Sequence, residues 1–421
     1  MLKEYTYNVS TLPCGLRLLH MPFTEAASVF VKLIGKVGDR AEGAHEIGAA
    51  HFFEHLIFDG TPSMPTGPDV ARTLARMGGR SNGQTGGETV RYWAHVLPEQ
   101  AEGAVAWLAD IFLHSLHREE DVVKERKVIA EELVSRLDNP ESVFWDEFES
   151  KIYAGTPIGR TLRETMDFLP KLTREGLLAY KDRAYVAENF VLEIGGNIDH
   201  ARALALAEKY FVSMASGARM QFAPIGHRTS INYILNKDVE QAKLALFFPG
   251  FSESDPDTPT AAVLAHILGG GQASRLFIKL REELHLVYNT GAHLDTLSDT
   301  GDFVVSAKLK EHKLNDATAA IIEILTDLST NQASDNELET ARNTAEMALA
   351  LEAERVVGHM GAAGHQLLMT GKIETPQEEM AKIAKVTKAD VLRVARNIFT
   401  KSPHVGLLAK DRKEFTLPAI T

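Results

Sequence analysis

The sequence predicts an α+β protein that is built from two related domains. Its 421 residues exceed what one ordinary hydrophobic core accommodates. Short runs typical of strands alternate along the chain with longer runs of helical periodicity. This order repeats after a segment that contains Ser, Gly and Pro, so we expect a first domain at 1–215, a linker at 216–226 and a second domain at 227–421.

A local comparison of the two halves supports an internal duplication. Residues 49–57 align with residues 260–268, and in this register His55 falls on His266. Alanine stands opposite His51 and opposite the glutamate that precedes His55. If the halves are related, the second half has lost the chemistry that these residues perform in the first.

Strands are predicted in the first half where β-branched or apolar runs end at turn residues, as the run 28–37 does at Gly38. The predicted strands are 5–10, 16–21, 28–37, 88–97 and 190–194. Helices are predicted where the helical period has a start such as Pro98 or a stop such as 59–62. The predicted helices are a segment after Glu46 that ends near residue 58, then 68–78, 98–114, 119–137, 141–152, 173–183 and 199–212, with 155–170 as a loop.

The second half is predicted to follow the same order. Its predicted strands are 230–235, 244–248, 288–296 and 302–309. Its predicted helices are 258–268, 274–284 and three or four helices between 313 and 400, which complete the chain.

The composition is that of an ordinary globular protein, with 44% hydrophobic and 24% charged residues. A formal charge of −12 without a basic cluster argues against nucleic-acid binding. Cys14 is the only cysteine, which excludes an intramolecular disulfide and a thiolate zinc cluster. No run approaches about 18 apolar residues and the N-terminus does not resemble a signal peptide, so we expect a cytoplasmic protein without a membrane span.

The sequence His51-Phe52-Phe53-Glu54-His55 is the strongest functional signal in the chain. On a helix, residues i and i+4 lie one turn apart on the same face, so His51 and His55 can bind one metal ion, and imidazole is a usual zinc ligand. Glu54 projects toward the same side and can accept a proton from metal-bound water. The residue order matches the inverzincin pattern. The alternative interpretation is a pair of core or capping histidines on an apolar helix.

The predicted helix 119–137 offers a third ligand. Glu125 and Glu132 share one stripe with apolar residues, whereas Glu131 is rotated by about 100° from Glu132. Carboxylates on an inward-facing stripe need a partner, because burying an unpaired charge is costly. We therefore predict that Glu132 binds the metal and that Glu125 orients a ligand. The alternative is that the helix is solvated and that its glutamates form salt bridges. We prefer this interpretation for Glu131.

With these residues assembled, the sequence resembles the inverzincin zinc peptidases, the family of pitrilysin, insulin-degrading enzyme and mitochondrial processing peptidase, and is most similar to their short, half-length bacterial-type branch. In that family the third zinc ligand is a glutamate about 77 positions after the second histidine, which here is Glu132. The family's auxiliary glutamate lies seven positions earlier, at Glu125. The resemblance implies bound Zn²⁺ and two domains, each a mainly antiparallel β-sheet packed with helices.

A second segment carries the resemblance in the first half. Asn82, Gly83 and Thr85, followed by Thr89 and Tyr92, are similar to the family's N-A-x-T segment that lines the substrate cleft. Gly83 replaces the usual alanine, a change between small residues. The resemblance implies that the first three of these residues bind substrate.

A third segment, residues 274–288, resembles the second-domain segment with the family's substrate-contacting Arg/Tyr pair, here Arg281 and Tyr288. Taken alone, these residues are a helix-surface arginine and a strand tyrosine. Family members enclose the substrate with four related domains, and this chain supplies two. The resemblance therefore implies a homodimer, or a heterodimer with a related metal-free subunit, in which the pair reaches the partner's zinc site.

The sequence thus predicts a zinc-dependent metalloendopeptidase that hydrolyses unstructured peptides or precursor segments. Glu54 is expected to act as the base and Tyr288 to stabilise the oxyanion. The peptide is expected to add a strand to a sheet edge near residues 80–85. The rival hypothesis is a non-catalytic structural or partner subunit of a peptidase-like complex.

Overall fold

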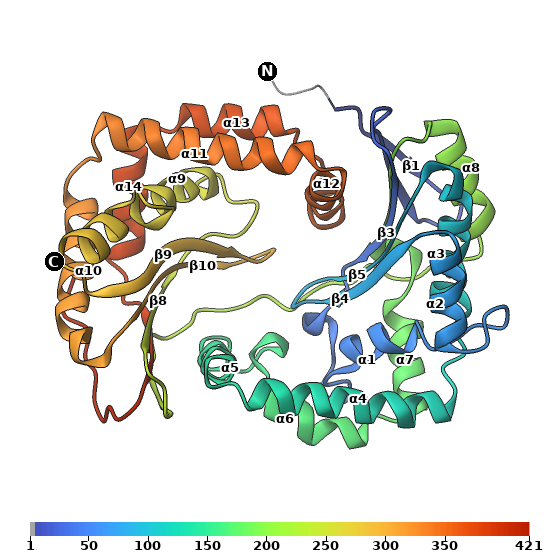
Figure 1. The fold of residues 1–421 in the computed structure, drawn as a ribbon, viewed down its shortest axis with the longest axis horizontal. Coiled ribbons are helices and arrows are strands. Elements are labelled where there is room, and N and C mark those ends of the chain that lie inside the picture. Colours follow the sequence, from blue (N-terminus) through green and yellow to red (C-terminus); the bar gives the residue numbers. More distant parts are fainter. Residues whose placement is uncertain (1–4, 421) are drawn as a thin grey trace. The chain divides into compact units, whose positions relative to one another are not determined.

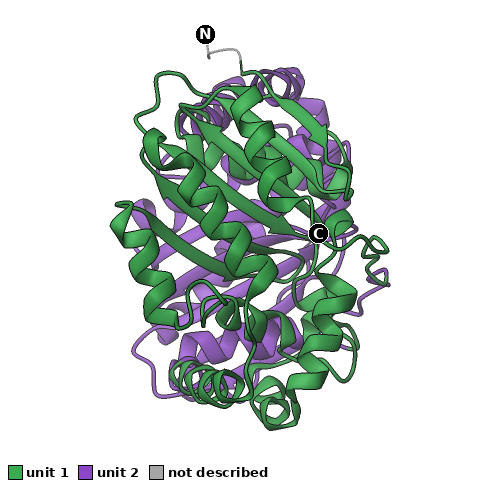
Figure 2. Cartoon of the chain, turned by 90° about the vertical axis from the view of Figure 1, so that its right-hand side faces the viewer, with its two compact units in different colours: residues 1–135, 155–223, 352–375 green, residues 136–154, 224–351, 376–421 purple. Residues whose placement is uncertain are grey.

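The computed structural model describes residues 5–420. They form two compact units, and each unit is assembled from three stretches of the chain (Figures 1 and 2). The first unit contains residues up to 135, then 155–223 and 352–375. The second unit contains 136–154, 224–351 and the residues from 376 onward.

A six-stranded sheet with the order β1-β2-β6-β3-β5-β4 forms the centre of the first unit. Neighbouring strands are antiparallel except β2 and β6, which are parallel. The strands are β1 (Asn8–Thr11), β2 (Arg17–Pro22), β3 (Val29–Gly35), β4 (Arg80–Thr85), β5 (Val90–Val96) and β6 (Phe190–Gly196). Every residue of β3 is buried, as expected for a central strand that helices cover on both faces.

Helices cover both faces of this sheet. The helix α3 packs against β3 and β5, α8 packs against β2, and α12 packs against β3 and β6 (Figure 1). Because side chains alternate along a strand, Phe30 and Ile34 share the face that contacts Met360 of α12. The helices of this unit are α1 (Ala49–Leu56), α2 (Gly67–Arg76), α3 (Ala101–His114), α4 (Glu119–Leu137), α6 (Leu162–Phe168), α7 (Arg174–Ala184), α8 (His200–Phe211) and α12 (Val356–Thr370).

A five-stranded sheet with the order β7-β11-β8-β10-β9 forms the centre of the second unit. Only β7 and β11 are parallel neighbours. Its strands are β7 (Asn232–Asn236), β8 (Ala242–Pro249), β9 (Val287–Thr296), β10 (Gly301–Leu309) and β11 (His404–Ala409). Its helices are α5 (Pro140–Ile152), α9 (Thr258–Gly269), α10 (Leu314–Thr330), α11 (Asp335–Glu354), α13 (Pro376–Lys385), α14 (Lys388–Phe399) and the π-helix Phe277–Glu283.

The two sheets have the same connectivity. In chain order, β7 to β11 take the places of β2 to β6, including the one parallel pair. The helix α1 follows β3, and α9 follows β8 at the corresponding position. The prediction of an α+β fold with two mainly antiparallel sheets is confirmed, and the shared connectivity supports a duplication.

Each half of the sequence contributes one helix to the unit built mainly from the other half. The helix α5 lies between β5 and β6 in the chain but packs against β11, where Phe144 and Phe148 fit over Gly406. The helix α12 lies between β10 and β11 in the chain but packs against β3 and β6. The predicted linker contains the point at 223/224 where the chain passes from the first unit to the second. The helix α5 precedes this point but belongs to the second unit, and α12 follows it but belongs to the first.

Three local predictions differ from the structure. Residues 80–85 were expected as a sheet edge but were not predicted as a strand, because the sequence RSNGQT shows no apolar alternation. In the structure they form β4 through their pairing with β5. The strand β11 was not predicted, since its short run follows several helices. The expected loop 155–170 contains α6, which a capping box between Thr161 and Glu164 starts.

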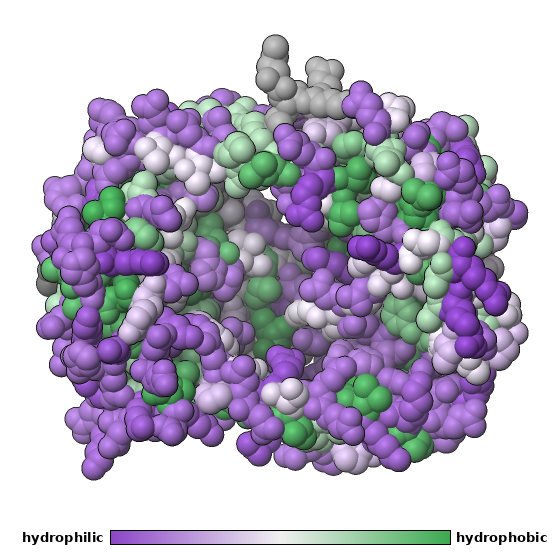
Figure 3. All heavy atoms as spheres, viewed as in Figure 1, coloured by the Kyte–Doolittle hydropathy of each residue, from purple (hydrophilic) through white to green (hydrophobic). Residues whose placement is uncertain are grey.

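Polar side chains cover most of the surface seen in Figure 3, and apolar residues are scattered between them, as on ordinary globular proteins. Within the described residues, none of the helices combines the length and apolar character that a membrane span requires.

Candidate metal centre

The short helix α1 carries three polar side chains on an otherwise apolar surface. Its buried residues are Ala49, Ala50, Phe52, Phe53 and Leu56. His51, Glu54 and His55 are only half-buried. The burial of the apolar side fixes the rotation of α1 about its axis, so these three side chains point away from the core.

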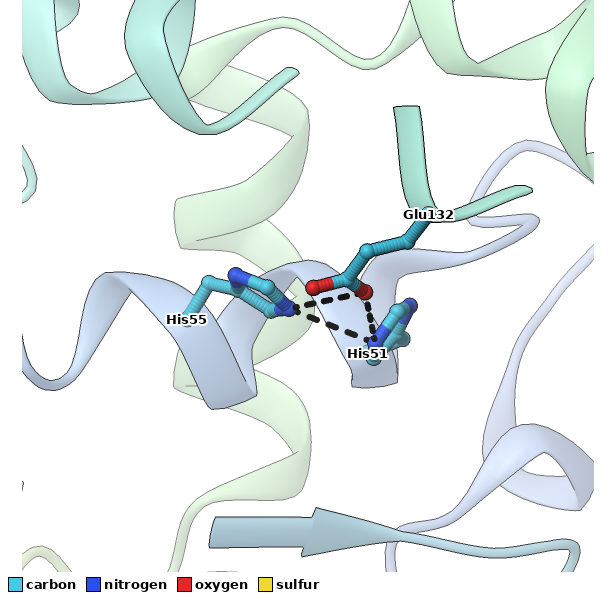
Figure 4. Close-up of side chains that lie close together, drawn as sticks. All are labelled: His51, His55 and Glu132. Carbon is cyan, nitrogen blue, oxygen red and sulfur yellow. Dashed lines mark hydrogen bonds and ion pairs between the residues drawn. The ribbon is translucent and has the colours of Figure 1, made fainter. Parts of the chain in front are cut away.

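His51, His55 and Glu132 bring three donor atoms together (Figure 4). The Nε2 atoms of the two histidines are 3.3 Å apart. Oε2 of Glu132, on α4, lies 3.6 Å from each of these nitrogen atoms. Within the described part of the chain, these are the residues among His, Cys, Asp and Glu that group closely enough to hold a metal ion.

These distances fit a zinc ion. Nitrogen or oxygen atoms about 2.0–2.1 Å from a tetrahedral zinc are separated by about 3.4 Å, close to the spacing of the three donors. The set of two imidazoles and one carboxylate is also typical of a zinc site that keeps one position open for water. The side chain of Glu132 is 48% exposed, so the group is reached from solvent.

Glu125 contacts the opposite side of the His55 ring. Nδ1 of His55 lies 2.9 Å from Oε2 of Glu125, which fixes the tautomer that leaves Nε2 free to bind a metal. Lys124 lies 2.9 Å from Oε1 of Glu125 and also pairs with Asp59. Burial disfavours the charged form of Glu125, but the hydrogen bonds from His55 and Lys124 outweigh it and lower the pKa of Glu125 to about 2. Glu125 is therefore an ionised acceptor for His55.

Glu54 lies against the edge strand β4. Oγ1 of Thr85 donates a hydrogen bond of 2.7 Å to Oε2 of Glu54. A Cβ atom on Gly83 would lie 2.7 Å from Cγ of Glu54, so glycine makes room for this side chain. Burial raises the pKa of Glu54, which favours a role as an acceptor and donor of protons. Asn82 is exposed on the same strand.

Tyr92, the last residue of the predicted substrate segment, belongs to the core. It is fully buried, and its hydroxyl lies 2.8 Å from the hydroxyl of Tyr185. It therefore supports the core beneath β4 and does not line an open surface.

Arg281 and Tyr288 lie together in the second unit, whereas the metal-binding group is in the first. Nη1 of Arg281 donates a 3.1 Å hydrogen bond to the backbone oxygen of Tyr288. The side chain of Tyr288 is 47% exposed at the start of β9. The corresponding edge strand of the first unit is β4, so the pair occupies the equivalent edge of the duplicated sheet.

The helix α9 of the second unit carries His266 at the position that corresponds to His55. Burial lowers the pKa of His266, and the described residues place no ligand group of three around it.

Three side chains around α1 were not predicted from the sequence. Asp59 was interpreted only as a helix stop, although Lys124 pairs with it and burial raises its pKa to about 6. Glu42 contacts the start of α1 and Arg160 pairs with Glu42, although both residues lie outside the predicted helices. The buried position of Glu42 is a tertiary property, so no local pattern revealed these contacts.

Family models and known proteins match most of this chain. Residues 19–166 match the family model described as "Insulinase (Peptidase family M16)", and residues 171–345 match "Peptidase M16 inactive domain". An "uncharacterized zinc protease" of Rickettsia bellii is 34% identical over 399 residues, which cover 94% of this chain and 96% of that protein. A Mycobacterium leprae protein with the same description is 32% identical over 416 residues, which cover 97% of this chain and 93% of that protein.

A solved structure, described as a protease from Helicobacter pylori, has the same fold with a TM-score of 0.88 at 21% identity. The match covers 96% of this chain and 100% of that chain. The relatives of similar length confirm the resemblance to the short bacterial-type branch that the motifs indicated. The chain belongs to peptidase family M16, the insulinase family.

Proposed function

We propose that this protein is a zinc-dependent endopeptidase that cleaves unstructured peptides or precursor segments. The observation that carries the proposal is the spacing of the donor atoms of His51, His55 and Glu132, which fits a tetrahedral zinc. The contact between Glu125 and His55 supports it, because histidine ligands of zinc commonly donate their other ring N–H to a carboxylate.

The residues around the donors have distinct roles in this proposal. A bound zinc ion would polarise water and the peptide carbonyl. Glu54 accepts the proton at a carboxylate oxygen and later delivers it to the leaving amine. Thr85 holds Glu54 through the 2.7 Å hydrogen bond, so that the carboxylate remains beside β4.

The substrate binds in an extended conformation beside β4. This strand is at the edge of its sheet, and a peptide can add to such an edge through main-chain hydrogen bonds. Glu54 lies beside β4, because its side chain contacts Gly83 and Thr85. Asn82, Gly83 and Thr85 therefore bind the residues that flank the cleaved bond.

The protein acts as a dimer in this proposal, either with a second copy or with a related metal-free subunit. Arg281 and Tyr288 contact the substrate, and Tyr288 donates to the oxyanion. Mixing Glu54→Gln chains with Arg281→Ala chains tests the arrangement. Recovered activity means that the pair acts on the partner's site, whereas two inactive components without recovery mean that it acts within one chain.

Zinc content and peptide cleavage, measured on the same preparation, test the proposed function. We expect about one zinc per chain and hydrolysis of an unstructured fluorogenic peptide, which a chelator abolishes. Glu54→Gln should retain zinc and lose about 10²- to 10⁴-fold in turnover. Glu132→Gln should lose zinc affinity, and Glu131→Gln on the same helix is the matched control.

The outcomes separate the candidate roles. A wild-type protein that binds zinc but cleaves no peptide would favour the non-catalytic subunit. Undiminished turnover of Glu54→Gln would remove Glu54 as the base. Unchanged zinc affinity of Glu132→Gln would remove Glu132 from the ligand set.

A further inference from the structure

The first turn of α1 receives its cap from a distant side chain. The N-cap residue Gly48 has a φ of +84° and no side chain to accept the free N–H groups. Glu42 takes that role, because its Oε2 accepts from the N–H of Gly48 at 3.0 Å and its Oε1 accepts from the N–H of Ala50 at 2.9 Å.

Arg160 fixes Glu42 from the other side. Its Nη1 donates a 3.0 Å hydrogen bond to Oε2 of Glu42, and its Nη2 donates to the backbone oxygen of Gly43 at 3.0 Å. The side chain of Glu42 is 3% exposed, and that of Arg160 is 18% exposed. The carboxylate therefore has partners on both oxygens and little freedom to move.

The turn that precedes Arg160 contacts the loop after the strand beside which the peptide is proposed to bind. Arg160 directly follows the 3-10 turn Pro157–Gly159. In that turn, Ile158 lies next to Gly87, since a Cβ atom on Gly87 would be 3.4 Å from its Cγ2. Gly87 is two residues beyond the end of β4. The turn thus contacts the loop that follows the edge strand, while Arg160 pairs with Glu42, the side chain that caps the metal-binding helix.

We propose that Glu42 and Arg160 are positioning residues that set the zinc affinity of the site. His51 follows Ala50, whose N–H bonds to Glu42, so any shift of the first turn moves His51 relative to His55. The inference rests on the proposed function, because it concerns the affinity for the metal that this function requires.

The competing explanation is that Glu42 and Arg160 only stabilise the fold. In that case their loss lowers the melting temperature and leaves the zinc dissociation constant unchanged. Arg17 provides the matched control, because its Nη1 donates a 2.6 Å hydrogen bond to the backbone oxygen of Leu367 in the same unit. Arg17→Met removes a guanidinium from a backbone carbonyl of α12, which packs against β3 and β6.

The test measures zinc affinity of the full chain by competition with a chelator of known affinity, together with the visible absorption of the cobalt-substituted protein. We expect Arg160→Met and Glu42→Gln to weaken zinc binding by about 10- to 100-fold, as for other groups that orient metal ligands. Arg160→Lys should recover part of the lost zinc affinity, because lysine restores the positive charge but cannot form the two hydrogen bonds of the guanidinium. Arg17→Met should keep the wild-type affinity within about twofold.

Each result decides a separate point. Unchanged affinity in Arg160→Met, with tight binding by the wild type, would overturn this inference and leave the proposed function intact. A wild-type chain without zinc affinity would overturn both. If Glu42→Gln does not fold, the two variants of Arg160 decide, because that side chain reaches the surface and its loss leaves α1 capped by Glu42.

Discussion

Two glycines on α12 allow a sharp test of how this helix packs on its sheet. The buried pair of Lys32 and Glu193, with 2.8 Å between its charged atoms, lies on the face of β3 and β6 that α12 covers. A Cβ atom on Gly364 would lie 1.9 Å from Oε1 and 2.2 Å from Cδ of Glu193. At Gly361 the nearest atom would be Nζ of Lys32, at 3.8 Å. The two positions thus differ in free space by almost 2 Å.

We expect Gly364→Ala to lower the free energy of unfolding. Overpacking of a buried site costs about 1–3 kcal/mol, and displacing one member of a buried ion pair costs more. The gain in helix propensity of about 1 kcal/mol offsets part of this, which leaves a net loss of about 1–3 kcal/mol. Gly361→Ala has the same propensity gain without the collision, so it should be neutral or stabilising by up to about 1 kcal/mol.

Urea unfolding of the wild type and of both variants, followed by circular dichroism, measures the difference. We expect the midpoint of Gly364→Ala to fall below that of Gly361→Ala. Equal midpoints, or a Gly364→Ala protein as stable as the wild type, would show that α12 does not press on Glu193 as described.

Three further predictions concern the first unit. Glu125→Gln should weaken zinc binding by about 10- to 100-fold in chelator competition, and Glu131→Gln should not. Thr85→Val should reduce kcat/KM by about fivefold with little change in zinc content, because Glu54 loses a hydrogen bond of about 1 kcal/mol; unchanged kinetics would contradict this role. Burial lowers the pKa of His117 from 6.5 to about 3, so below pH 6.5 the unfolded chain binds a proton that the folded chain excludes. The free energy of unfolding should therefore fall by up to about 1.4 kcal/mol per pH unit below pH 6.5, and His117→Asn should reduce this slope in urea titrations.

The parts of the site that follow from local periodicity were predictable from the sequence. His51, Glu54 and His55 share one face of α1 because of the helical repeat, and the same repeat puts Glu125 and Glu132 on one stripe of α4. The structure brings the donors of the two helices together as these stripes suggested. The α+β class and the repeated order were also readable from runs of strand and helix.

The parts that depend on distant contacts were not predictable. Glu42 caps α1 from outside the helix, and Arg160 reaches it from 118 positions further along the chain. The strand character of β4 comes from its pairing with β5, since its own residues are polar. The exchange of α5 and α12 depends on which sheet face each helix fits, and a single sequence does not encode that choice in any local pattern.

The exchange of α5 and α12 bears on the order in which the protein matures during synthesis. The sheet of the first unit has all its strands once β6 has left the ribosome, but the helix that covers Lys32 and Glu193 follows more than 150 residues later. Until then the nascent chain exposes to water the ion pair and the apolar sheet face that α12 buries in the finished protein. Neither half, expressed alone, would contain the helix that completes its own sheet. The two halves of this chain therefore have to mature together.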